Sequence, residues 1–520
     1  MTRGTAYSLI KPRSKPVIFV HTLVSNRFTR KYGLISVLLM VILGLLYYRR
    51  VLFNCNNLQQ KYIYQTLPLY QRSVSLAFGN ESNIEVEDTG QHDRWLPIGD
   101  VDKKFKLYSA YFDPRLEVVE SYRVPNGFLP FGSIRIFAIL PMNVRKVDIF
   151  CNFRSDNNYV AQHQADQVEA VHEHWNMQFA ATYVICKLAG NVTKREARLP
   201  DEVALSYLGE PSMQEATNFV RIKYPRKDRL FRSSPPRSLA VCVGPLHHNF
   251  AYALRMVEFF EYYKMNGAER FYVYNKSATP EVDTVLRYYQ ATGLVQVLDW
   301  HFDGYKFENE LRYEGIFVAL NECFYRATVA GGFRYTAIVD FDELLFPTSD
   351  KETLLEYLLA KDRYDVHSFN FQGVFFYDIY APDFSHVPPW ANNTYLYTQV
   401  RNVRTKNPLL HHNRSKYVMK GRNVFEAGNH FVWKAVRDTY EYEVPENEGL
   451  LMHYRDGSLG YDFENVVLDT RIQERFGKQL WQVVNEKCAA IFPTTGVCPL
   501  GENYNRNYNH RSKVPRTSHL

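Results

Sequence analysis

The spacing of apolar residues changes along the chain and separates regions of different expected structure. Between residues 100 and 224, short runs rich in β-branched and aromatic residues alternate with Pro, Gly and Asn, which predicts strands joined by turns. The clearest runs are Lys106–Phe112, Ser133–Leu140 and Ala181–Cys186. We therefore predict a β-rich, sandwich-like accessory domain at residues 96–224 and a linker at 225–237.

After the linker, the pattern becomes an alternation of buried strands and amphipathic helices. The predicted strands are Ser238–Val243, Arg270–Tyr274, Leu294–Leu298 and Tyr335–Val339, and the predicted helices lie near Leu254–Glu261, Val282–Tyr289 and Glu310–Val329. This alternation predicts a parallel sheet with right-handed crossovers. We expect an α/β catalytic domain at residues 238–470, followed by a C-terminal extension at 471–520.

Two aspartates follow the last predicted strand directly, in Asp340-Phe341-Asp342, and Glu343 comes next. Ligands bind at the carboxyl ends of parallel strands, which is where this motif falls. The period-two alternation of a strand predicts that Asp340 and Asp342 point to one side while Phe341 packs on the other. Carboxylates at this spacing suit Mn²⁺ or Mg²⁺ beside a diphosphate. We predict a divalent-metal site here; the alternative is a solvated turn.

A histidine further along the chain is a candidate third ligand. His453-Tyr454-Arg455 follows the apolar run Leu450-Leu451-Met452. A neutral imidazole would complete the metal shell, and Arg455 would pair with the diphosphate. His430 competes with His453 for this role, and a satisfied core histidine is the alternative for His453.

The basic charge of the chain is concentrated at one end. The net charge is +7, yet the first 80 residues hold eleven Lys or Arg and no Asp or Glu, so the remainder carries −4. A mildly acidic body argues against nucleic-acid binding. The uncharged, mostly aliphatic run at 33–48 predicts a membrane anchor at 33–53, between a cytoplasmic basic tail at 1–32 and a stem at 54–95.

The heavier positive charge before the apolar run keeps that side cytoplasmic and the C-terminal body lumenal. We expect a single-pass type II Golgi membrane protein. A cleaved signal peptide is the alternative, disfavoured by the long basic lead and the lack of a clear small-residue cleavage site.

Cysteines and glycosylation sequons agree with a lumenal body. The sequence leaves the pairing of the six body cysteines open, although the short loop makes Cys488 with Cys498 the first guess. Cys55 is the odd cysteine and is available to cross-link a homodimer beside the membrane. Asn-x-Ser/Thr triplets occur at Asn80, Asn191, Asn275, Asn392 and Asn413.

Taken in order, stretches of the α/β region resemble glycosyltransferase family 92, animal and plant enzymes of which some are β-galactosyltransferases. The matching stretches are Cys242–Leu246, Val257–Tyr263, Gly267–Tyr274, Val285–Tyr289, Asn321–Arg326, Val339–Glu343, Lys416 with His430, and His453–Arg455. The resemblance implies a GT-A-type, Rossmann-like nucleotide-sugar domain. It also implies a UDP-sugar donor carrying galactose, a divalent metal (Mn²⁺ or Mg²⁺) and inversion at the anomeric carbon.

By that likeness, Asp340 and Asp342 bind the metal and diphosphate, with His453 as the third ligand. The family commonly has Asn-Asp-Cys where this chain has Asn321-Glu322-Cys323, and often an aliphatic residue at the position of Phe341. Glu322 keeps the charge of Asp but moves it by one methylene, which leaves its role open.

The remaining chemistry needs a base and a donor-binding surface. An inverting transfer requires a carboxylate that takes the acceptor proton, and the candidates are Glu343, Glu426 and Asp456, with Asp378 and Asp383 also present. We expect the donor nucleoside to meet the strand-end residues Tyr274, Asn275 and Asp299, and the phosphates to meet Arg326. Each is also an ordinary strand-end or helix-cap residue.

The sequence thus predicts a metal-dependent inverting glycosyltransferase that moves a hexose from a UDP-sugar to a glycan acceptor. A catalytically silent glycan-binding pseudo-transferase is the alternative, and intact Asp340, Asp342 and His453 argue against it. A phosphotransferase or nuclease would require a Walker-type loop or a basic nucleic-acid surface, and the sequence contains neither.

Overall fold

The computed structural model describes residues 93–98, 105–113, 115, 128–156, 158–191, 199–207, 216–225, 238–302, 310–349, 353–378, 380, 385–391, 394–455 and 465–501. All of them belong to one compact unit. The predicted anchor, Cys55 and Asp456 lie outside the described residues. Within the described residues, no helix is long and apolar enough to cross a membrane.

The β-rich part of the chain forms a sheet with strand order β5-β4-β8-β9-β2-β3-β7-β6, and β1 pairs with β2. Its strands are β1 (Leu96–Pro97), β2 (Lys106–Asp113), β3 (Phe128–Pro141), β4 (Ile149–Ser155), β5 (Asn158–Gln164), β6 (Gln167–Ala170), β7 (Phe179–Asn191), β8 (Glu202–Tyr207) and β9 (Val220–Lys223). The three strands predicted here are confirmed as β2, β3 and β7. The two separate sheets of a sandwich are not found among the described strands, because the parallel pair β2 and β9 joins them into one hydrogen-bonded path.

The central sheet has strand order β12-β11-β10-β13-β18-β15-β21. Its strands are β10 (Leu239–Leu246), β11 (Ala268–Asn275), β12 (Val295–Asp299), β13 (Tyr335–Val339), β15 (Val366–Phe371), β18 (Lys416–Met419) and β21 (Tyr440–Val444). The first four run parallel, as predicted, whereas β18 is antiparallel to β13 and β15. The chain moves outward from β10 to β12 and then returns to the other side of β10 as β13. This reversal of strand order is where α/β sheets bind ligands.

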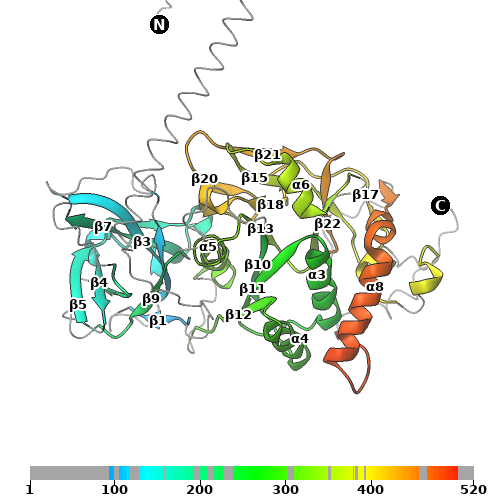
Figure 1. Cartoon of the computed structure of the whole chain (residues 1–520), viewed down its shortest axis with the longest axis horizontal. Helices are drawn as coiled ribbons and strands as arrows, with labels where there is room; N and C mark the ends of the chain where they lie inside the picture. The colour runs from blue at the N-terminus through cyan, green and yellow to red at the C-terminus, as the bar shows by residue number, and fades with distance from the viewer. Residues whose placement is uncertain are drawn as a thin grey trace, which may run out of the picture. The chain divides into compact units, whose positions relative to one another are not determined.

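Helices cover both faces of the central sheet (Figure 1). Three helices pack against one another on one face: α3 (Ala253–Met265), α4 (Pro280–Ala291) and α8 (Arg471–Ile491). The fourth, α5 (Ile316–Tyr325), packs between β10 and the β-rich sheet. The single helix predicted near 310–329 is wrong in extent. A 3₁₀ turn, η4 (Arg312–Gly315), precedes α5, and a π turn, η5 (Arg326–Ala330), follows it.

A smaller sheet joins the acidic motif to the predicted histidine. Its strand order is β14-β22-β16, and Glu343 on β14 lies opposite His453 on β22. Its strands are β14 (Glu343–Pro347), β16 (Gly373–Phe375) and β22 (Gly449–His453). The other elements of this part are α6 (Leu354–Lys361), α7 (Tyr397–Val400), β17 (Val403–Thr405), β19 (Val424–Ala427), β20 (Val432–Ala435) and β23 (Val466–Leu468).

Three disulfides are present among the described residues: Cys151–Cys186, Cys242–Cys323 and Cys488–Cys498. The last confirms the predicted pair. The second covalently links β10 to α5, so the helix is tied to the strand that borders the reversal of strand order.

Candidate active site

The acidic motif forms a turn rather than the end of a strand. β13 ends at Val339, and the Glu343 N–H donates a 3.1 Å hydrogen bond to the Asp340 carbonyl oxygen, which closes a turn over these four residues. The period-two argument for Asp340 and Asp342 is therefore wrong, since the extended backbone stops one residue earlier. The two carboxylates contact different partners.

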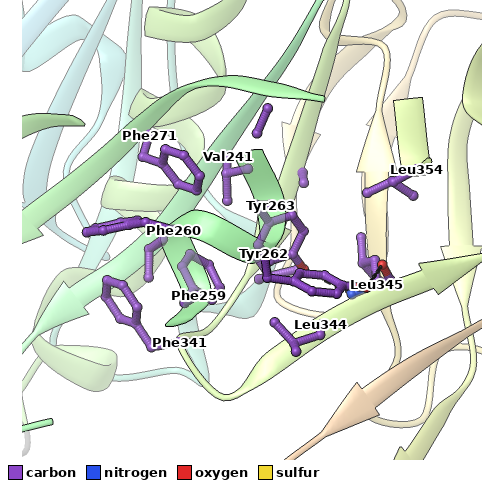
Figure 2. Close-up of a cluster of buried hydrophobic side chains, with 14 of the residues drawn as sticks. Val241, Phe259, Phe260, Tyr262, Tyr263, Phe271, Phe341, Leu344, Leu345 and Leu354 are labelled. Carbon is purple, nitrogen blue, oxygen red and sulfur yellow. Dashed lines mark hydrogen bonds between the residues drawn. The ribbon is translucent and has the colours of Figure 1, made fainter. Parts of the chain in front are cut away.

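An aromatic core beneath the turn holds it in place (Figure 2). Phe341 is 7% exposed, and its ring centroid lies 4.8 Å from that of Phe259 and 5.8 Å from that of Phe260, both on α3. From the same helix, the Tyr263 hydroxyl donates to the Glu343 carbonyl oxygen at 3.0 Å. Helix α3 thus positions the turn through both packing and a hydrogen bond.

A buried lysine balances the charge of the turn. Lys416, the first residue of β18, donates from Nζ to Asp340 Oδ2 and to Asn429 Oδ1, each at 3.0 Å, and lies 3.4 Å from Glu343 Oε2. Burial by itself lowers the pKa of Lys416, but the two carboxylates raise it above its usual value. Burial raises the pKa of Glu343 to about 7, against the opposing charge of Lys416. Lys416 therefore stays cationic at neutral pH.

Asp342 pairs with the predicted histidine. His453 Nε2 lies 3.2 Å from Asp342 Oδ2, and the Tyr454 N–H donates to the Asp342 carbonyl oxygen at 2.8 Å. Burial acts to raise the pKa of Asp342, but the charges of His453 and Arg255 bring it below its usual range. Burial acts to lower the pKa of His453, and the carboxylates of Asp342 and Glu343 raise it above its usual value.

The start of α5 approaches the acidic turn closely, at a glycine. A Cβ atom on Gly244 of β10 would lie 3.3 Å from Ile316 Cδ1 and 3.6 Å from Asp340 Oδ1. Ile316 is the first residue of α5. A 3₁₀ turn leads directly into α5, so the first N–H of the helix is already paired: the Ile316 N–H donates to the Tyr313 carbonyl oxygen. The carboxyl ends of β10 and β13 and the N-terminus of α5 therefore meet at Asp340.

The donor atoms at this edge are of the types that bind a divalent metal. Carboxylate oxygens and an imidazole nitrogen suit Mn²⁺ or Mg²⁺. His453 Nδ1 is buried and makes no hydrogen bond among the described residues, although it lies 3.5 Å from Glu343 Oε1. Across the described ranges, no three or more His, Cys, Asp or Glu side chains are arranged to hold a metal. The residue types fit such an ion, with Asp342 and His453 as the donors that are already adjacent.

Three of the residues expected to bind the donor lie along this edge. Asn275 ends β11 and Asp299 ends β12, opposite each other in the parallel register. Asn275 Nδ2 donates to Asp283 Oδ1 at 3.0 Å, while its buried Oδ1 has no hydrogen-bond partner in the described part of the chain. Arg455 follows β22 by two residues, and its N–H donates to the Phe376 carbonyl oxygen at 3.1 Å.

Tyr274 and Arg326 do not reach the acidic turn. Both are fully buried in a network around Glu322 of α5. The Tyr274 hydroxyl donates to Glu322 Oε2, and Arg326 Nη2 lies 2.5 Å from Glu322 Oε1 and 2.6 Å from Asp93 Oδ2. The strand alternation of β11 turns Tyr274 towards this network, so we do not retain either residue in the donor site.

The predicted bases Glu343 and Glu426 are also enclosed. Glu343 is 2% exposed and accepts the Asp340 N–H at 2.8 Å. Glu426 on β19 is fully buried and accepts from the N–H of His172 at 2.7 Å, with His172 Nδ1 at 2.8 Å. Neither carboxylate is exposed to an acceptor hydroxyl, because both are buried; Glu426 Oε2 makes no hydrogen bond among the described residues and lies 3.7 Å from Lys434 Nζ. His430, the competing ligand, contacts the Ser415 carbonyl oxygen through Nδ1 at 3.0 Å.

Two residues near the site were given no role from the sequence. The sequence could have indicated Lys416, because a lysine at the start of a buried strand requires a carboxylate partner. Glu173, from the β-rich part, accepts the Asn429 N–H at 3.0 Å, and Asn429 in turn accepts from Lys416. No local pattern indicates Glu173, since its position depends on contact between two distant segments.

The fold and site together define an α/β protein with an acidic centre at its reversal of strand order. Residues 237–492, which include α8, match the model of glycosyltransferase family 92, and this segment belongs to that family. The beta-1,4-galactosyltransferase galt-1 of Caenorhabditis elegans is similar, with 25% identity over 246 residues that cover 46% of this chain and 52% of that protein. This chain therefore spans about half the length of that curated relative.

Two solved structures are also similar. Glucosyl-3-phosphoglycerate synthase from Mycobacterium tuberculosis is 12% identical, with 43% of this chain and 74% of that chain covered and a TM-score of 0.22. Galactosyltransferase LgtC is 10% identical, with 52% and 99% covered and a TM-score of 0.24. Such low TM-scores do not establish a shared fold.

Proposed function

We propose that the protein is an inverting glycosyltransferase that moves a hexose, assigned as galactose, from a UDP-sugar to a glycan acceptor. The observation that carries this proposal is the acidic turn with Asp340 and Asp342 at the reversal of strand order, within a segment that belongs to family 92. The name of the similar nematode protein supports galactose. The charge pattern of the first 80 residues supports placement in the Golgi membrane with this body in the lumen.

In such a transfer, different residues at the carboxyl-terminal edge of the central sheet would bind different parts of the donor. Asn275 and Asp299 would hold the nucleoside, and Arg455 would pair with the diphosphate. Asp340, Asp342 and His453 would hold a divalent metal, which supplies positive charge for the leaving diphosphate.

The reaction itself exchanges one bond for another. The acceptor oxygen forms a bond to the anomeric carbon while the bond to the diphosphate oxygen breaks, and UDP leaves with that electron pair. The hydroxyl proton passes to a carboxylate. Asp456 remains a prediction for this role, because it lies outside the described residues.

The test measures UDP release by the full-length chain from a panel of UDP-sugars, with and without Mn²⁺ and with an N-glycan acceptor. We expect metal-dependent release that is greatest with UDP-galactose. Absence of release from every donor, with glycan binding intact, would favour the silent glycan-binding alternative and exclude a transferase.

A matched pair of variants localises any activity. Asp340→Asn removes a charge at the turn and should lower turnover. Glu486→Gln removes a charge from a side chain that is 73% exposed on α8 and should leave turnover unchanged. Equal activity in both variants would mean that the acidic turn is not the site.

A further inference from the structure

An exposed aromatic pair lies where the β-rich sheet meets the segment before α5. Trp175 is 65% exposed and Tyr313 is 57% exposed. The guanidinium carbon of Arg312 lies 3.7 Å from the ring centroid of Trp175 and 3.5 Å from that of Tyr313. Arg312 thus lies between the two rings and contacts one face of each by a cation–π interaction. We call these three residues the aromatic platform.

The backbone of the aromatic platform is strained at both rings. Trp175 has a φ of 54° and Tyr313 a φ of 39°, in the left-handed region that bulky residues rarely adopt. Such strain persists only where the surrounding structure imposes it, and it concentrates at ligand sites. Two exposed aromatic residues held in this way against one guanidinium indicate a surface arranged for binding.

Tyr313 lies close in sequence to Ile316, the residue of α5 that borders the acidic turn. It precedes Ile316 by three residues, within η4. The Ile316 side chain is the one that, with Asp340, lies next to Gly244. Tyr313 is therefore within one helical turn, along the chain, of the residue that borders the acidic turn.

Trp175 is connected to the same turn from the other direction. Glu173, two residues before it, accepts the Asn429 N–H, and the Asn429 side chain accepts from Lys416, which binds Asp340. Both segments of the aromatic platform are therefore linked to the acidic turn through a few intervening residues, although the two segments come from different parts of the chain.

We propose that the aromatic platform binds a neutral pyranose ring of the glycan acceptor. The apolar C–H face of the sugar would stack on Trp175 or on Tyr313, on the face of the ring that Arg312 does not cover. Glu173, His174 and Arg312 line a small neighbouring cavity, which is itself too small for a sugar ring, and they carry hydrogen-bonding groups for sugar hydroxyls. A stable protein partner needs a much larger surface than two rings. This inference rests on the proposed transferase function and adds the place of its acceptor.

The test measures binding of a 2-aminobenzamide-labelled N-glycan pool to the full-length chain without donor, together with KM for acceptor and donor. Trp175→Ala and Tyr313→Ala should each weaken glycan binding and raise the acceptor KM about two- to tenfold, with the donor KM unchanged. Trp175→Phe, which keeps a ring, should retain most of the binding. The matched control is Tyr364→Ala, because Tyr364 is 62% exposed on a different loop.

The outcomes separate this inference from the proposed function. Wild-type glycan affinity in both alanine variants, or equal weakening by Tyr364→Ala, overturns the aromatic platform while UDP release still supports the transferase. If no UDP-sugar is turned over but the two variants lose glycan binding, the aromatic platform stands and the transferase fails.

Discussion

Helix α5 has a charged cluster at each end, and the two clusters differ in how their charges are satisfied. Towards its C-terminus, the Glu322 carboxylate is fully buried and accepts from Ser109, Tyr111, Tyr274 and Arg326. In the acidic turn, whose Asp340 lies near the N-terminus of α5, the side chains of Asp340 and Asp342 are 44% and 27% exposed.

Both clusters contain carboxylates, so charge does not distinguish a structural cluster from a candidate active site. The difference is how completely protein groups satisfy each carboxylate and exclude it from solvent. A buried carboxylate with all its hydrogen bonds supplied by the protein has nothing left for a ligand, and its removal leaves other charges unpaired. A partly exposed carboxylate at the end of a parallel strand keeps its capacity to bind. We call these the closed cluster, around Glu322, and the open cluster, around Asp342.

The largest expected effect is a loss of stability from the closed cluster. Glu322→Ala leaves the buried Arg326 guanidinium without its main counter-charge, so the free energy of unfolding should fall by about 3–5 kcal/mol. Chemical denaturation with the full-length chain measures this fall. The milder Glu322→Gln keeps hydrogen bonding and should remain folded with UDP release near wild type. A Glu322→Gln protein that is folded but inactive would place the closed cluster in the active site.

The same contrast explains which residues could be predicted from the sequence. The β-strand and helix alternation predicted the parallel strands and the position of Asp340, because those depend on local patterns. Tyr274 and Asn275 are neighbours at one strand end, yet one joins the closed cluster and the other lies on the donor edge. Strand alternation turns their side chains in opposite directions, but the charged network that Tyr274 meets also depends on Ser109 and Tyr111, more than 150 residues earlier, which no local pattern indicates.

The second prediction concerns the open cluster. Asp342→Asn preserves shape but removes the charge beside His453, so turnover should fall about 10²- to 10³-fold. Because His453 and Arg255 hold the pKa of Asp342 below its usual range, the variant should also lose some stability at neutral pH, but less than the loss of activity would require. Steady-state UDP release and thermal unfolding measure the two quantities. A variant that unfolds at lower temperature in proportion to its lost activity would make Asp342 a structural residue like Glu322.

The third prediction concerns the pH dependence of the stability that the closed cluster contributes through Asp93, which pairs with Arg326. Burial acts to raise the pKa of Asp93, but Lys223 and Arg326 lower it from 3.8 to about 2. Because the folded pKa lies below the unfolded one, this contribution is complete above about pH 4 and disappears as the pH falls through about 2. It amounts to about 2 kcal/mol. Asp93→Asn should lower stability at neutral pH by about that amount and should differ less from wild type near pH 2 in denaturation curves.

The smallest effect on stability is expected for Phe341, the core residue that packs beneath the open cluster. Phe341→Leu keeps an apolar side chain but loses ring contacts with Phe259 and Phe260, which should cost about 1 kcal/mol in the free energy of unfolding. Because Phe341 lies between Asp340 and Asp342 in a tight turn, a small shift of the ring moves both carboxylates. We expect UDP release to fall further than this loss of stability explains, through a lower kcat with the donor KM unchanged.

A control in the same core, Phe271→Leu, removes similar packing without touching the turn (Figure 2). Equal activity in the two variants would show that the core supports the fold alone and that the open cluster is positioned by Lys416 and His453 instead.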